Sequence, residues 1–166
     1  MNTLCLVLAS VFVLVTSQSF GALRSEELAA LDRYVGVWDD TSDPAGKVTI
    51  TCEWTLDGSF LRHSWIFDSG DGSPKNFGLQ LMSYDAADHT FRAWTFYSNG
   101  LVLQGEGVWD APSKTFTWTV HDPATGQTTV SKAAFVGHNQ EDFSSKTTDS
   151  DGKVLFELKR KKVRRE

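Results

Sequence analysis

From Lys47 onward, apolar and polar residues alternate, and this period of two is the feature that most constrains the fold. In the stretch 47–54 every second residue is apolar: Val48, Ile50, Cys52 and Trp54. Such alternation is typical of a β-strand with one buried face. Counting a first one at Trp38, about ten such segments follow one another, with Asp, Gly, Pro or Asn between them. The short links favour an all-β, up-and-down antiparallel β-barrel of about 8–10 strands, because closure removes exposed strand edges.

A short helix is expected before the strands, over residues 25–36. Ser25 is a typical N-cap residue, and Glu26 and Glu27 are favourable in the first turn of a helix. Gly36 can end the helix. The sequence therefore predicts a barrel preceded by one short helix.

The Asp57-Gly58 pair predicts a tight turn between two strands. Counting outward from this turn pairs Cys52 with His63, with Cβ atoms about 4.5–5.5 Å apart. Trp65 falls on the same apolar face as this pair. We expect these side chains to point into the barrel.

The Asn99-Gly100 pair predicts a second tight turn. Counting from it pairs Arg92 with Gly107 and places Trp94 on the inner face. A buried Arg92 would need a carboxylate or an anionic ligand, whereas at the barrel mouth it could reach water.

Two octapeptides share one pattern: YDAADHTF, residues 84–91, and WDAPSKTF, residues 109–116. The Asp of each can start a turn by hydrogen-bonding the backbone two residues on. Counting from the Asn99-Gly100 turn puts Phe91 and Phe116 on opposite faces. A binding site used twice would keep its face, so we interpret the repeat as a barrel corner used twice at one end.

Several segments, in this order and spacing, carry a resemblance: YVGVW, DGSFLRHSW, YDAADHTFRAW, LQGEGVWDAPSKTFTW and DGKVLFELKRKK. They resemble lipocalin-like barrels of the calycin type. More closely, the chain from about Leu28 to Lys162 is similar to an uncharacterised bacterial family, domain of unknown function 1579. The resemblance implies a fold and no established activity.

The Gly36-x-Trp38 motif belongs to the same resemblance. In lipocalin-like barrels the Trp closes one barrel end beneath a basic residue of the last strand. The resemblance therefore implies a structural role for Gly36, Trp38 and a basic partner. Arg160 is the candidate partner because it shares a face with Phe156 and Leu158.

The N-terminus carries an apolar run over residues 4–15, which is too short to span a bilayer and is followed by small residues. This pattern predicts a signal peptide over residues 1–21, and hence a secreted or periplasmic protein. A buried N-terminal helix or strand is the alternative. The barrel domain is then expected over 22–162, with the end of a basic tail at 163–166.

The charge of the chain is uneven. The formal net charge is −5, yet the tail from Lys159 holds six of the 16 basic residues and one of the 21 acidic ones. The tail is therefore +5 and the rest of the chain −10. An acidic body argues against nucleic-acid binding. The tail is either a solvated end or a contact for anionic surfaces.

Candidate ligand-binding residues are those expected on the inner faces of the barrel. They are Cys52, Trp54, His63, Trp65, Arg92, Trp94 and Trp118. Gly105 and Gly107 share this face and either open a pocket between the Trp side chains or relieve crowding. A thiol beside an imidazole can form a reactive thiolate, or the pair can be an inert part of the core.

Three functions stay open. The first is an exported barrel that binds a small apolar or aromatic ligand. The second is an enzyme of lyase or isomerase type that uses the pocket, with His63 and Arg92 as its polar groups. The third is a structural or interaction protein with a filled barrel. The sequence carries no catalytic motif, cofactor-binding motif or metal-ligand spacing.

Overall fold

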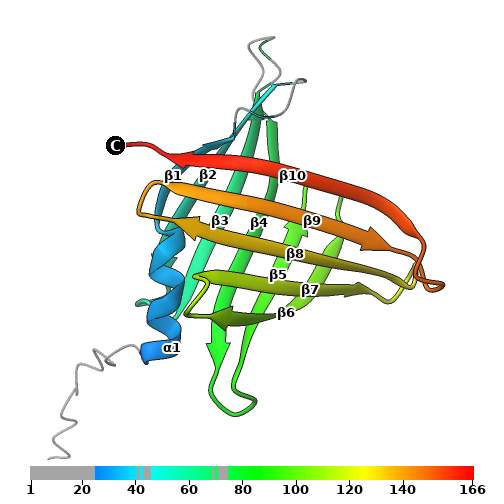
Figure 1. Cartoon of the computed structure of the whole chain (residues 1–166), viewed down its shortest axis with the longest axis horizontal. Helices are drawn as coiled ribbons and strands as arrows, with labels where there is room; N and C mark the ends of the chain where they lie inside the picture. The colour runs from blue at the N-terminus through cyan, green and yellow to red at the C-terminus, as the bar shows by residue number, and fades with distance from the viewer. Residues whose placement is uncertain (1–24, 41, 43–45, 69, 71–74) are drawn as a thin grey trace, which may run out of the picture.

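The computed structural model describes residues 25–40, 42, 46–68, 70 and 75–166. They form a closed antiparallel barrel whose strands follow one another in chain order, and the last strand pairs with the first (Figure 1). The elements are α1 (Glu26–Ala29), η1 (Ala30–Tyr34), β1 (Gly36–Asp40), β2 (Lys47–Thr55), β3 (Phe60–Asp68), β4 (Lys75–Asp85), β5 (Thr90–Tyr97), β6 (Val102–Asp110), β7 (Thr115–Asp122), β8 (Gln127–Val136), β9 (Gln140–Thr148) and β10 (Val154–Arg164).

The predicted fold class, an all-β up-and-down barrel with a short N-terminal helix, is confirmed, and the barrel has ten strands. β2–β4 run at a steep angle to β8–β10 (Figure 1), as strand twist and tilt require in a closed barrel. β10 continues to Arg164, so the barrel includes two residues that the sequence assigns to the tail. The predicted signal peptide, residues 1–21, lies outside the described residues.

The short helix covers one end of the barrel. The Ser25 side chain accepts a hydrogen bond from the backbone N–H of Leu28 at 3.1 Å, as expected of an N-cap. After one α-helical turn the chain tightens into the 3₁₀ turn η1, which directs Leu31 and Tyr34 into the barrel end. Neither of these short segments is long enough to cross a bilayer, and the rest of the described chain holds no helix that could.

The register predicted from Asp57-Gly58 is confirmed. Cys52 pairs with His63, and Trp54 pairs with Leu61. The connecting loop spans the four residues 56–59 and not two, but the count between the strands is unchanged. The inner face of β2 and β3 is therefore as expected.

The register predicted from Asn99-Gly100 is wrong by one residue. The Tyr97 N–H donates to the Leu101 carbonyl at 2.9 Å, which closes a three-residue loop. Gly100 has φ +88°, the left-handed conformation that ends a loop of this length. A slip of one residue turns every side chain of a strand over, so Arg92 pairs with Glu106 on the outside of the barrel.

The two octapeptides form the same corner in the same orientation. Tyr84 pairs with Phe91, and Trp109 pairs with Phe116. Both pairs face inward, and the rings of Phe91 and Phe116 meet edge to face with centroids 5.0 Å apart. The prediction that these two Phe residues lie on opposite faces is wrong, because it rested on the slipped register. The repeat is still a corner, and it supplies an inward aromatic pair each time.

The two corners differ in how the Asp acts. Asp85 accepts a hydrogen bond from the Ala87 backbone N–H at 3.0 Å, as predicted. The same prediction is wrong for Asp110, because Pro112 has no backbone N–H, and Asp110 accepts from the Ser113 hydroxyl instead.

Candidate functional site

Tyr34 closes the interior at the helix end. Its ring lies 4.9 Å from that of Phe135 and 5.4 Å from that of Phe116, centroid to centroid. The Trp118 indole N–H donates to the Tyr34 hydroxyl at 3.1 Å, and the Trp38 indole N–H donates to the Tyr34 carbonyl at 2.7 Å. The indole N–H groups of Trp38 and Trp118 and the Tyr34 hydroxyl are thus hydrogen-bonded, and this half of the barrel is filled.

The basic residue over Trp38 is Arg164 and not the predicted Arg160. The Arg164 guanidinium carbon lies 4.5 Å from the Trp38 ring centroid, and its Nη2 donates to the Arg33 carbonyl at 2.7 Å. Arg160 instead approaches Asp40, with Nε and Oδ2 3.5 Å apart. Both arginines face inward from β10, so the shared face was correct and the position along the strand was not.

Two inward-facing glycines are each covered by an indole ring from the neighbouring strand. Trp65 pairs with Gly78, and Trp118 pairs with Gly107. A Cβ atom on Gly107 would lie 2.6 Å from the Trp118 ring, and one on Gly78 would lie 3.0 Å from the Trp65 ring. The space left by each glycine is thus filled by the neighbouring indole, and Gly107 opens no pocket.

His63 is buried at the centre of the interior, with 6% of its surface exposed. Its ring lies between those of Trp65 and Tyr34, with centroids 4.8 and 6.0 Å away. Burial and the nearby Lys162 ammonium lower the pKa of His63 to about 3, although a hydrogen bond with Gln80 acts in the opposite direction. The imidazole is therefore neutral at pH 7. Within the described part of the chain its Nδ1 has no hydrogen-bond partner.

Cys52 lies beside His63 as predicted, but it is not a reactive thiolate. The residue is 2% exposed, and burial raises the pKa of its thiol far above the usual range. Lys162 and Arg164 favour the thiolate, yet the cost of burial exceeds their effect. Cys52 is a small apolar core residue with a protonated thiol.

The interior holds a buried ion pair that was not predicted from the sequence. Lys162 Nζ lies 2.6 Å from Glu141 Oε1, and both residues are almost fully buried. The ammonium also lies 4.2 Å from the Phe143 ring centroid. Counting faces along the last two strands was the available signal, because Glu141 and Lys162 are direct cross-strand partners.

The half of the barrel away from the helix has a different lining. Hydroxyl pairs cross the β8–β9 ladder on the inner face, at 2.8 Å between Thr129 and Thr147 and 3.0 Å between Ser131 and Ser145. On other strands the same half presents apolar and aromatic groups. The inward-facing residues of this half are each partly exposed: Trp65, Tyr97, Leu103, Val120, Thr129, Ser131, Ser145, Thr147 and Leu158.

The remaining candidate residues do not line this half. Arg92 lies on the outer face, where it contacts Glu106 and, at 2.5 Å, Asp88. Trp94 is also on the outer face, against the ring of Phe60. Both predictions are wrong because of the one-residue slip at Asn99-Gly100.

His63 and Arg92 therefore lie on opposite faces of the sheet, and the pair suggested for lyase or isomerase chemistry is not assembled. Trp54 does face inward, but it lies at the helix end, where its indole N–H donates to Asp32 at 2.7 Å. Of the seven candidates, the centre of the barrel brings together four: Cys52, His63, Trp65 and Trp118.

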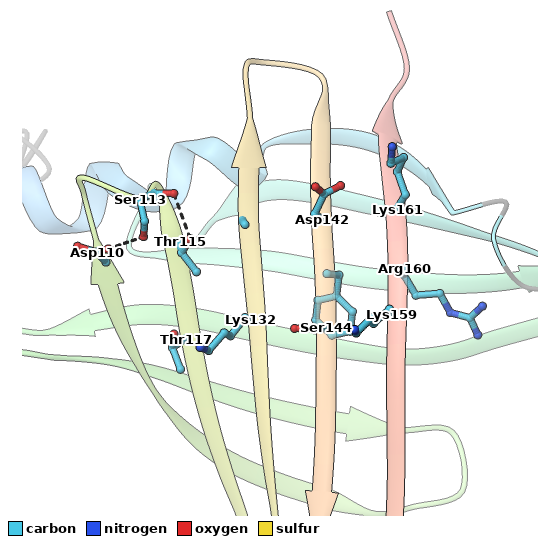
Figure 2. A pocket seen from close by; sticks show the side chains of 12 residues that line it. Asp110, Ser113, Thr115, Thr117, Lys132, Asp142, Ser144, Lys159, Arg160 and Lys161 are labelled. Carbon is cyan, nitrogen blue, oxygen red and sulfur yellow. Dashed lines mark hydrogen bonds between the residues drawn. The ribbon is translucent and has the colours of Figure 1, made fainter.

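Two grooves lined by described residues lie outside the barrel. One runs between the helix and the corners that contain Trp109 and Phe135. The other crosses the outer face of β7–β10 and has a volume of about 690 Å³ (Figure 2). Across residues 25–40, 46–68 and 75–166, no cluster of three or more His, Cys, Asp or Glu side chains is arranged to hold a metal ion.

Comparison of the chain with models of protein families gives no match, and comparison with curated proteins gives no significant relative. The resemblance to the domain of unknown function 1579 therefore stays a prediction.

Proposed function

We propose that the protein is exported and binds a small molecule in the half of the barrel away from the helix. The observation that carries this proposal is the partial exposure of inward-facing residues at mid-barrel, above all Ser131, Ser145 and Trp65. In a closed barrel, an inward side chain at that level reaches solvent only through the lumen. Along β8, Ser131 lies about 13 Å from Gln127, where the strand begins.

The lining indicates the chemistry of the ligand. One wall offers the indole face of Trp65 with apolar side chains, and the opposite wall offers the Ser and Thr hydroxyls of β8 and β9. A mostly apolar wall with a few polar groups is typical of small-molecule sites. We infer a small, uncharged aromatic or aliphatic ligand with one hydrogen-bonding edge. Export is supported by the apolar N-terminal run alone.

The test uses 1-aminoanthracene, a small uncharged aromatic fluorophore. We expect it to bind with one site per chain and to gain fluorescence. Ser131→Trp places an indole inside the lumen and should abolish binding. Val130→Trp is the matched control, because Val130 is the adjacent residue on the outer face of β8, and it should leave binding unchanged.

Ser145→Leu is a smaller change at the same level and provides a second test if Ser131→Trp does not fold. Binding that both inward variants leave unchanged would contradict the proposal. No binding by the wild-type protein, together with no retained small molecule in native mass spectrometry of protein from its own host, would instead favour a filled, structural barrel.

A further inference from the structure

The basic residues at the end of the chain lie on both faces of β10 and just beyond it, and most of them already have a structural partner. Arg160 approaches Asp40, and Lys162 binds Glu141. Arg164 covers Trp38, and beyond the strand Arg165 binds Asp39 with two hydrogen bonds of 2.7 Å. The residues that remain, Lys159 and Lys161, point outward from β10 and are exposed.

Lys159 belongs to a row of outward residues that crosses four strands. It pairs with Ser144 on β9, Ser144 pairs with Lys132 on β8, and Lys132 pairs with Thr117 on β7. All four line the groove of about 690 Å³, and Figure 2 shows them at one level along the strands. Two strand spacings separate the lysines, so their Cα atoms are about 10 Å apart and both ammonium groups can reach one group above Ser144.

This level of the groove is positive and rich in hydrogen-bond donors. In the described part of the chain, Lys132 and Lys159 form no ion pair with an acidic residue. The groove's carboxylates lie at the next level, toward the β8–β9 turn. There Asp142 pairs across the strands with Lys161, and Asp110 accepts a hydrogen bond from Ser113 (Figure 2).

We propose that this groove binds the phosphate group of a small soluble phosphate ester, between the ammonium groups of Lys132 and Lys159 and above the Ser144 hydroxyl. A phosphate monoester is a compact dianion with several acceptor oxygens, and it suits two point charges and one O–H donor. Asp142 and Asp110 face the remainder of the ester and favour one that carries hydroxyl or amino groups. They also argue against a membrane or a nucleic acid, because a polyanion across the whole groove would place its charges beside both carboxylates.

The site is distinct from the proposed lumen, because outward and inward residues of β8 alternate. Failure of one proposal therefore leaves the other intact: Ser131→Trp should abolish fluorophore binding and leave phosphate binding unchanged. The sequence predicts that the basic end of the chain can contact anionic groups. The phosphate proposal assigns this contact to Lys159 and not to the whole tail.

The experiment is a titration with inorganic phosphate at constant pH and low, constant ionic strength, followed by the amide chemical shifts of the folded protein. We expect saturable shifts near Thr117, Lys132, Ser144 and Lys159. Lys132→Gln and Lys159→Gln should each weaken binding about five- to tenfold, as expected for the loss of one charge-assisted hydrogen bond at an exposed site. Lys153→Gln makes the same charge change in the β9–β10 turn and is the matched control.

Equal weakening by Lys153→Gln would overturn the proposal, because it would show a general charge effect. Shifts spread over all exposed lysines would do the same. A second arm uses vesicles of phosphatidic acid with phosphatidylcholine: binding to these vesicles without any response to free phosphate would identify a membrane surface and overturn the assignment to a soluble ester.

Discussion

The guanidinium of Arg164 lies 4.5 Å from the Trp38 ring centroid, across the strand pair that closes the barrel. Trp38 and Arg164 are direct cross-strand partners on β1 and β10, the first and last strands. Gly36 makes room for this arrangement, since a Cβ atom there would lie 3.3 Å from the Arg164 side chain. This cation–π contact thus links the first and last strands beside the helix, next to the ion pair between Arg165 and Asp39.

We expect Arg164→Ala to lower the free energy of unfolding by about 2–3 kcal/mol, because it removes a shielded cation–π contact and a charged hydrogen bond to the Arg33 carbonyl. Arg164→Met keeps the aliphatic packing and should lose less. Urea unfolding measures the change. Lys161→Ala, on the outer face of the same strand, should have an effect within about 0.5 kcal/mol. Equal effects of the Ala variants at 161 and 164 would contradict the structural role.

How much the sequence predicts is best seen at the two turns. Asp57-Gly58 and Asn99-Gly100 look alike, and period-two counting from the first gives the correct inner face. At the second, Gly100 takes the last position of a three-residue loop, and the Asn99 side chain accepts from the Leu101 N–H at 3.0 Å. The local sequence does not distinguish the four-residue loop at Asp57-Gly58 from the three-residue loop at Asn99-Gly100, because Gly58 and Gly100 both take a positive φ.

The site shows the same limit. Because the register was wrong by one residue, Arg92 and Trp94 were predicted on the inner face although they lie on the outer face. The suggested catalytic pair of His63 and Arg92 depended on the same error. Alternation alone did identify the neighbours Cys52 and His63. The protonation states of these two groups could not be predicted, because they depend on depth of burial and on Lys162, which comes from a strand 99 positions beyond His63 in the chain.

We expect Gly107→Ala to destabilise the protein by about 1–3 kcal/mol, since the added methyl group would lie 2.6 Å from the Trp118 ring and cannot fit without movement. A double-mutant cycle tests the cause. Gly107→Ala should cost much less in a Trp118→Leu background, where no indole covers position 107. If the cost were the same in both backgrounds, it would arise from the strand backbone and not from the indole contact.

We expect Cys52 to resist N-ethylmaleimide in the folded protein and to react at once in denaturant. The thiol is buried and protonated, so neither access nor thiolate is present. Mass spectrometry measures the extent of labelling. The control is Glu53→Cys in a Cys52→Ala background, which places a thiol at the adjacent exposed position and should react quickly. Rapid labelling of wild-type Cys52 would mean that the β2–β3 face assignment is wrong.

His63 should make stability depend on pH. Burial holds its pKa at about 3 in the folded protein, against 6.5 ordinarily. Below pH 6.5 the unfolded chain therefore takes up a proton that the folded chain does not accept until about pH 3, and the free energy of unfolding falls as the pH falls through that window. Between pH 7 and 4.5 the loss should be about 2.5 kcal/mol. Asp39, whose pKa is lowered to about 2, loses its contribution only below its ordinary value of 3.8, outside the measured range.

The measurement is urea unfolding at a series of pH values, with His63→Gln as the test variant. Gln has no proton to take up in this range, so the variant should be less stable at pH 7 but should lose about 2.5 kcal/mol less between pH 7 and 4.5. His89→Gln is the matched control, because His89 lies exposed in the β4–β5 corner, and its pH profile should follow that of the wild type. Parallel profiles for wild type and His63→Gln would show that His63 ionises freely when folded, and that the centre of the barrel is open to water.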